Sequence, residues 1–270
     1  MAWKDAYQYA GKLFGKHSNT AVASAESQHQ QAAREDVNLP LRARIGGVVN
    51  LQKTPFIRAV SQGSLISMPE EKDSLIRAIS RVRLDIAGSL YRYYLLTGDQ
   101  DDKECFIQLY QNDAGDISEL MYYSRLTRLI PESSEDQEAY SGSAGYGLGD
   151  RSYTLWREQL TGLAWDEASL DSIFGDAGHL DYSRDAGDPL SDFVAPFQAQ
   201  ESRIDDAGGQ HGLIQDLIFM PYSRALEGQR ESLLISTEIV RSQDGDSSRR
   251  QIHVDFMIGI PVELDRLLIQ

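Results

Sequence analysis

The residues of this sequence with the clearest chemical potential are a glutamate and a histidine near its C-terminal end, Glu238 and His253. A carboxylate beside an imidazole can act as a general-base pair. Between them lies a segment rich in Ser, Asp and Gly, and a turn centred on Gly245 and Asp246 would place the two residues opposite each other in a hairpin. Because strand faces often carry such pairs for solubility alone, we interpret this pair as a candidate for ligand binding rather than catalysis.

A second candidate site comes from the triplet Tyr-Ser-Arg, which occurs at residues 123–125, 182–184 and 222–224. Guanidinium groups bind carboxylates and phosphates through paired hydrogen bonds, so Arg125 and Arg224 could line a shared anion site. The alternative is structural, because two of the copies have similar strand-like surroundings and could reflect duplication of one strand. We favour the structural interpretation and keep both arginines as candidate ligand-binding residues.

Other chemistry has little support in the sequence. The single cysteine, Cys105, lies in an apolar run that is typical of a buried, inert thiol. A glycine-rich run at residues 142–149 lacks the Lys-Ser/Thr of a phosphate-binding loop, and we interpret it as a mobile connection. No zinc-hydrolase or serine-hydrolase motif is present.

Several aspartates could gather a hard cation, but they lack the spacing of an EF-hand loop: Asp176, Asp181, Asp185, Asp188 and Asp192. We predict no catalytic residue, no metal site and no cofactor.

The Glu238–His253 pair depends on two antiparallel strands within residues 231–260. Apolar and polar residues alternate there, as in strands with one buried face. The register places Ile235 opposite Phe256 on the buried face and Glu238 opposite His253 on the other face. A shift by one residue would bury the charged side chains and expose the apolar ones, so this register is well specified.

The middle of the chain predicts an antiparallel meander over residues 74–130. Its strands are expected at 74–86, 90–97, 105–110 and 117–130. The strand at 90–97 has large side chains on both faces, so we expect cover on both sides. A helix running through Arg83 is the alternative to the first strand.

Beyond the meander we expect a capped helix at 133–140, a short helix followed by long loops in 166–206, and a strand at 213–222. The predicted fold is α+β, mainly antiparallel β, with the meander and the C-terminal hairpin around one core and few short helices.

The chain is expected to divide into an N-terminal segment, 1–37, and one β-rich domain, 38–270, with a soft boundary near 131–150. Residues 2–15 predict a short helix followed by a polar linker. Aromatic residues follow one stripe of this helix, with lysines beside it: Trp3, Tyr7, Phe14, Lys4 and Lys12. This pattern suits weak, reversible contact of residues 1–16 with a membrane surface or a partner protein, and packing on the body is the alternative.

The net charge is −15, and residues 166–206 hold nine more acidic than basic residues. Nucleic acid is therefore excluded as a partner of the body, because phosphate binding needs a basic surface. A protein partner suits this charge better.

No apolar stretch approaches the roughly eighteen residues of a membrane span, and we see no secretion signal. We expect a cytoplasmic protein, peripheral to the inner membrane where residues 1–16 make contact, and leave its oligomeric state open.

Four short motifs, within 39–47, 90–95, 218–224 and 231–261, resemble those of the DUF2491 group of bacterial proteins. The likeness covers about residues 38–270. The group has no established activity, so it supplies no site residues. Its genes tend to lie beside one for a PspA-like membrane-stress protein, which implies an accessory role near the membrane. We therefore expect a non-catalytic interaction or accessory protein; the alternative is a small-ligand-binding protein or enzyme with a pocket near Arg125, Arg224 or His253.

Overall fold

The structure, a computed structural model, describes residues 34–69, 73–84, 88–96, 104–163, 165–240 and 251–270. Its strands are β1 (Val48–Leu51), β2 (Asp73–Leu84), β3 (Ser89–Leu95), β4 (Cys105–Gln111), β5 (Ile117–Leu129), β6 (Ser152–Trp156), β7 (His179–Arg184), β8 (Phe197–Ile204), β9 (Gly212–Leu226), β10 (Gln229–Val240), β11 (Gln251–Pro261) and β12 (Leu267–Ile269). The α-helices are α2 (Thr54–Ser61), α3 (Ser134–Ser141) and α4 (Glu167–Phe174). Short 3-10 turns occur at Pro40–Arg42, Arg157–Leu160, Gly175–Ala177 and Leu264–Arg266.

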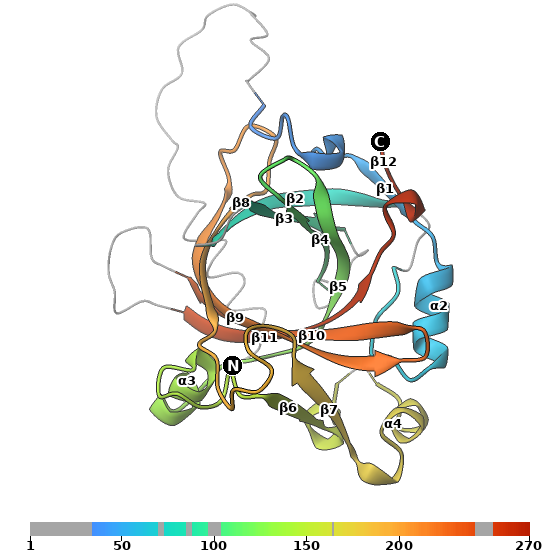
Figure 1. Ribbon diagram of the computed structural model, residues 1–270. Coiled ribbons are helices and arrows are strands. Elements are labelled where there is room, and N and C mark those ends of the chain that lie inside the picture. Colours follow the sequence, from blue (N-terminus) through green and yellow to red (C-terminus); the bar gives the residue numbers. More distant parts are fainter. Residues whose placement is uncertain (1–33, 70–72, 85–87, 97–103, 164, 241–250) are drawn as a thin grey trace, which may run out of the picture.

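Eight of these strands form a closed antiparallel barrel (Figure 1). Neighbours pair in the order β2-β3-β4-β5-β11-β10-β9, and β8 pairs with both β9 and β2, which closes the ring. Two short extensions leave it: β1 and β12 pair beside the start of β2, and β7 and β6 pair beside the end of β9. Closure removes the two free edges that an open sheet of these strands would expose.

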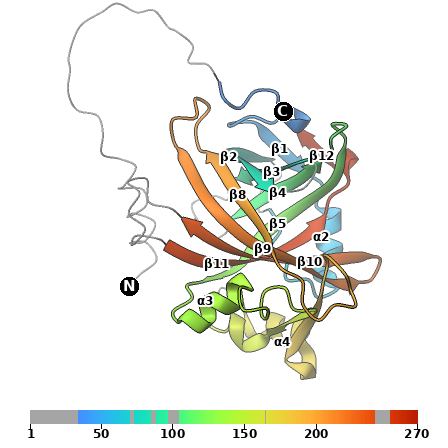
Figure 2. The same cartoon turned by 60° about the vertical axis from the view of Figure 1, so that its left-hand side comes forward.

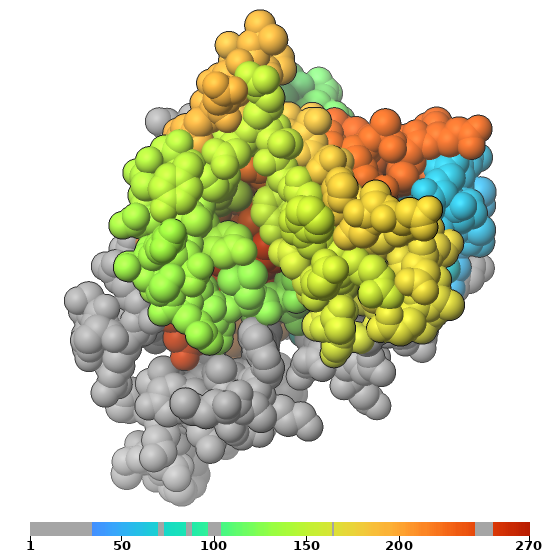
Figure 3. Space-filling model, turned by 90° about the horizontal axis from the view of Figure 1, so that it is seen from below, coloured from blue at the N-terminus to red at the C-terminus, as the bar shows by residue number. Residues whose placement is uncertain are grey.

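The outer face of the barrel is covered on two sides. Helix α2 lies against one side, where Phe56 meets the ring of Tyr122 edge-on at 4.9 Å (Figures 1 and 2). On the other side, α3, β6, α4 and β7 spread over the lower face (Figure 3). Tyr140 of α3 packs edge-on against Phe256 of β11 at 6.1 Å. The larger apolar core of the protein therefore lies outside the barrel, between its wall and these covering elements.

A smaller apolar cluster fills part of the barrel interior. All eight barrel strands contribute to it, through Ala78, Val82, Leu90, Tyr94, Phe106, Met121, Tyr123, Ala199, Leu217, Phe219, Leu234 and Met257. An eight-stranded barrel is just wide enough for side chains to fill it or to hold one small ligand. The interior positions left over by this cluster are polar, and they make up the site described below.

The predicted hairpin register is confirmed residue by residue, with Ile235 opposite Phe256 and Glu238 opposite His253. The meander is also confirmed as β2 to β5, and the alternative helix through Arg83 is wrong, because that residue lies in β2. Strand β3 is covered on both faces, as expected. Helix α3 begins after Ser133, whose side chain accepts a hydrogen bond from the backbone N–H of Asp136. These elements share strong local signals of alternation, turn residues or caps.

Two expectations for residues 142–206 are wrong. The segment after α4 contains β7 and β8 instead of long loops, and β8 is the strand that closes the barrel. The glycine-rich connection is packed: a Cβ on Gly149 would lie 2.2 Å from the carbonyl oxygen of Val194, and its N–H donates to the hydroxyl of Tyr222 at 2.9 Å. Glycine is required there because backbone and side chains approach closely. Helix α2 is an element that we did not predict.

The expected N-terminal helix, with Trp3, Tyr7, Phe14, Lys4 and Lys12, lies outside the described residues. Near the start of the described chain, Asp36 already packs against the domain. Its carboxylate is buried and accepts a hydrogen bond from the N–H of Ile45 at 2.7 Å. None of the helices in the described ranges is long and apolar enough to cross a membrane.

The strand that closes the barrel, β8, carries a buried carboxylate that several neighbours share. Four groups converge on the buried carboxylate of Glu201 in β8, and all of them donate: Ser80, Tyr94, Arg92 and Gln215. Glu201→Gln would replace one acceptor oxygen by a donor and leave Arg92 without its nearest carboxylate. We expect a loss of about 3 kcal/mol in unfolding free energy, measured by urea denaturation.

The matched control is Glu263→Gln, which removes one exposed ion pair with Arg266. Its expected cost is below about 1 kcal/mol. Equal costs for the two variants would contradict the role given to Glu201.

Candidate functional site

The polar part of the barrel interior is built by strand alternation. On β3 the side chains of Leu90, Arg92 and Tyr94 point inward, while those of Tyr91 and Tyr93 join the outer layer. The same alternation turns Glu238 of β10 and Asp255 of β11 into the barrel. The face of the hairpin that we expected to be a solvated surface is therefore the barrel interior, and Glu238 is only 8% exposed.

The first of two ionic clusters surrounds Glu201. Its Oε1 atom accepts from the hydroxyls of Ser80 and Tyr94 at 2.5 and 2.7 Å. Its Oε2 atom accepts from Gln215 Nε2 at 2.8 Å and lies 3.4 Å from Arg92 Nη1. Arg92 also donates to Gln108 and stacks over the ring of Phe106 at 5.0 Å. A guanidinium is thus held in the middle of the barrel, with 2% of the residue exposed.

The second cluster contains the predicted pair. His253 Nε2 lies 2.7 Å from Glu238 Oε2, and Arg128 Nη2 lies 3.6 Å from the same oxygen. Arg128 also donates through Nε and Nη2 to the two oxygens of Asp255. The sequence predicted the contact between Glu238 and His253 but not the arginine and aspartate that complete the group.

The two carboxylates of this cluster differ in acidity. Burial alone would raise the pKa of Glu238, but the hydrogen bond and charge of His253, with the charges of Arg128 and Arg92, outweigh burial and lower that pKa to about 2. Burial and the charge of Glu238 raise the pKa of Asp255 against the effect of Arg128. Glu238 is therefore ionised at neutral pH and too weak a base for general-base catalysis.

Three ligand atoms of this cluster, one each from Glu238, His253 and Asp255, lie within 4.8 Å of one another. A metal ion could use such a donor set. Arg128 already binds both carboxylates, so a cation would have to displace a guanidinium. The residues present fit an internal ion-pair network better than a metal centre.

Three buried polar atoms in or next to the two clusters lack a hydrogen-bond partner in the part of the chain that the structure describes. Arg92 Nη2, Gln215 Oε1 and Ser236 Oγ are buried, and none of them has a hydrogen-bond partner among the described residues. Gln215 binds Glu201, and Ser236 lies opposite Asp255 in the ladder between β10 and β11. Buried polar atoms require partners, so these atoms mark where water or a small molecule completes the network.

The mouth of the barrel on this side carries further charges. Arg77 Nη2 lies 3.1 Å from Glu104 Oε2, and Arg203 Nη1 lies 3.9 Å from the same oxygen. The charges of Arg125, Arg203 and Arg128 lower the pKa of Glu104 although burial would raise it. Arg125, a predicted site residue, therefore belongs to this inward-facing set.

Arg224 lies elsewhere, on the outer face of β9. Its Nε donates to the buried carboxylate of Glu231 at 2.6 Å, and its Nη2 donates to the carbonyl oxygen of Gly63. The structure thus separates Arg224 from Arg125 by the barrel wall. Two Tyr-Ser-Arg triplets are instead neighbours in the sheet, with Ser183 of β7 opposite Ser223 of β9. Their contacts are structural.

The remaining candidates are structural or isolated. Burial raises the pKa of Cys105 to about 11, which agrees with an inert thiol. The acidic residues considered for a cation have separate partners: Asp181 accepts from Thr154, Asp185 pairs with Arg230, and Asp192 pairs with Arg151. They do not converge on one point.

Sequence reasoning missed Arg92, Glu201, Arg128 and Asp255. One signal was present, because Arg92 stands between Leu90 and Tyr94 on a strand that we expected to be covered on both faces. A charged residue on such a strand requires a buried counter-charge. Its partner is 109 positions away on β8, and no local pattern could identify it.

The fold and the site define a class of protein: a closed antiparallel barrel that has ion pairs in its interior and an apolar layer between its outer wall and the elements that cover it. The sequence matches the family described as "Protein of unknown function (DUF2491)" over residues 10–267. The chain belongs to this family, and the match begins well before residue 38, where we expected the likeness to start. No curated protein and no solved structure matches the chain.

A pH prediction follows from Glu238. Because its folded-state pKa of about 2 is below the ordinary value of 4.5, it stabilises the fold above about pH 4.5, and this contribution is lost as the pH falls towards 2. We expect Glu238→Gln to cost about 2–3 kcal/mol at pH 7 and about 1 kcal/mol at pH 3, because half or more of the contribution is lost by then; urea denaturation measures both. The exposed control, Glu132→Gln, should cost little at either pH. A cost for Glu238→Gln that does not change with pH would contradict this assignment.

Proposed function

We propose that this protein is a non-catalytic binding protein that holds a small anion inside the barrel, next to Arg92. The observation that carries the proposal is the unpartnered Nη2 donor of Arg92, which belongs to a permanent cation and is buried. Gln215, which binds the same Glu201 oxygen that Arg92 approaches, carries a second buried atom without a partner among the described residues. A carboxylate or phosphate oxygen is the natural acceptor for a guanidinium. The unpartnered Gln215 Oε1 atom accepts hydrogen bonds, so it suits a hydroxyl on the same molecule.

Binding is a better interpretation of this site than catalysis. The carboxylates near the clusters are held by arginines, and Glu238 stays ionised at neutral pH. A fixed set of paired charges recognises shape and charge, and carboxylates held in ion pairs with arginines are poor general bases. The proposal takes up the expected ligand-binding alternative with Arg125 and His253, and it leaves Arg224 out of the site.

The expected accessory role beside a PspA-like membrane-stress system is a separate proposal. It rests on the family resemblance, and it is compatible with ligand binding. Identification of the proteins that co-purify with the full chain from its native host would test it.

The binding proposal is tested by titrating the full-length protein with inorganic phosphate, malonate and citrate in a thermal unfolding assay. We expect a saturable rise in unfolding temperature with at least one anion. Arg77→Gln removes a positive charge at the mouth beside Glu104 and should weaken that anion several-fold, because the interior loses a nearby favourable charge. Arg83→Gln changes the opposite face of the same strand and should leave affinity unchanged. No response in the wild type, or equal affinities for the two variants, would contradict the proposal.

The variant Ser236→Ala distinguishes an effect on anion binding from an effect on stability. Its hydroxyl is buried and unpartnered, so Ser236→Ala removes a desolvation cost without changing shape. We expect the ligand-free variant to gain about 1 kcal/mol in unfolding free energy and to bind the anion more weakly than the wild type. Chemical denaturation with and without the anion measures both effects. A variant that loses stability would show that this hydroxyl has a structural partner.

A further inference from the structure

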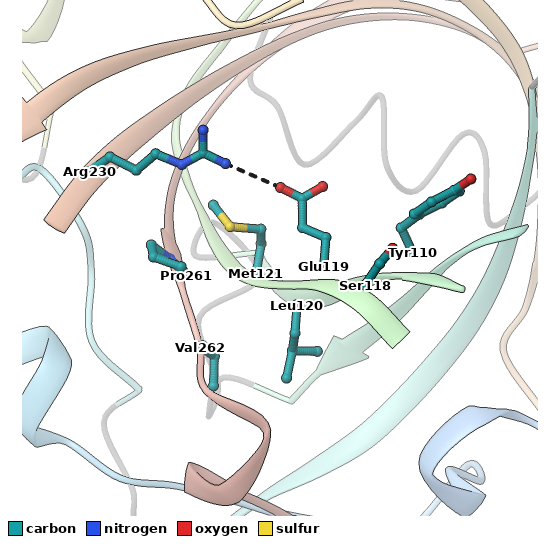
Figure 4. Close-up of a pocket in the computed structure, with 8 residues that line it drawn as sticks. All are labelled: Tyr110, Ser118, Glu119, Leu120, Met121, Arg230, Pro261 and Val262. Carbon is teal, nitrogen blue, oxygen red and sulfur yellow. Dashed lines mark hydrogen bonds and ion pairs between the residues drawn. The ribbon is translucent and has the colours of Figure 1, made fainter. Parts of the chain in front are cut away.

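The far end of the barrel holds a cavity of about 470 Å³, remote from the ionic clusters (Figure 4). It lies where β5 begins and β10 begins, next to the end of β11. Its lining combines polar and apolar side chains, among them Tyr110, Glu119, Met121, Arg230 and Pro261. Glu119 and Met121 point to the same side of β5, toward Arg230, and Leu120 points to the other side (Figure 4).

At this cavity one guanidinium, of Arg230, pairs with two carboxylates, of Asp185 and Glu119. Arg230 Nη1 lies 2.7 Å from Asp185 Oδ2, whereas Arg230 Nη2 lies 3.4 Å from Glu119 Oε1. The guanidinium is therefore shared between two carboxylates, and its closer contact is with Asp185. This group of one guanidinium and two carboxylates has a net charge of −1, and Glu119 is its carboxylate that lines the cavity.

From this arrangement we infer that the cavity is a binding site for a small organic cation, a protonated amine that carries an apolar group. The ammonium would pair with Glu119, and the apolar group would contact Met121 and Pro261. The aromatic ring of Tyr110 adds a favourable surface for a cation. The net charge of −15 raises the local concentration of cations around the protein, which favours a cationic ligand at this exposed end.

The test uses the full-length protein and benzylamine as the probe, with benzyl alcohol as its uncharged counterpart, in ligand-observed NMR titrations. Benzylamine should bind with a dissociation constant in the millimolar range, and benzyl alcohol at least several-fold more weakly. Glu119→Gln should weaken benzylamine about 3- to 10-fold, because the charge-assisted hydrogen bond becomes a neutral one. Glu119 is half-exposed, so this variant should fold.

Two controls keep the result specific. Glu132→Gln changes an exposed glutamate outside the cavity and should leave benzylamine binding unchanged. Arg77→Gln affects the anion site at the opposite end and should also leave it unchanged, so the two proposals can fail independently. The inference is overturned if wild-type protein does not bind benzylamine, if benzyl alcohol binds as tightly, or if Glu119→Gln binds benzylamine like the wild type.

Discussion

The burial of Arg92 against Glu201 is the constraint on which the rest of this structure depends. A guanidinium cannot lose its proton, so a barrel that encloses one must also enclose counter-charge and hydrogen-bond acceptors. Glu201 provides both, and it belongs to β8, the strand that closes the ring. Closure of the barrel and neutralisation of its interior are therefore achieved by the same strand. The remaining donors to Glu201 come from β2, β3 and β9, so one carboxylate connects four strands.

A polar interior changes where the apolar core can lie. The barrel contains only a modest apolar cluster, and the larger cluster lies between the outer wall and the elements that cover it. Much of the apolar burial therefore comes from the elements that cover the outer wall: helix α2, the β1–β12 pair and the segment from α3 to β7. Charged side chains occupy the interior positions where apolar residues would otherwise pack. This explains why the buried pair of Glu231 and Arg224 lies outside the barrel: that layer is also protein interior. Two ionic networks on opposite faces of one wall are compatible because both faces are covered.

The parts that sequence could predict are those with short-range causes. The register of β10 and β11 agrees with the alternation of apolar and polar residues, and the cap of α3 follows from Ser133 and Asp136. The predicted turn at Gly245 and Asp246 lies outside the described residues. The contact between Glu238 and His253 came with that register. Strand β8 has polar residues on both faces, because Glu201 and Arg203 point into an ionic interior, so it resembled a solvated acidic loop. Arg125 and Arg224 were grouped through a shared triplet, although the wall of the barrel separates them. Pairings between distant segments decided these cases, and a single sequence gives no signal for them.

The central claim, that the barrel interior holds a small anion beside Arg92, is tested most directly by a high-resolution crystal structure of the full chain purified from its native host. We expect electron density for a small oxygen-bearing molecule within hydrogen-bonding distance of Arg92 Nη2, also in contact with Gln215 or Ser236. Density that shows Arg92 Nη2 bound to a protein side chain, with no non-protein molecule other than water in the interior, would contradict it.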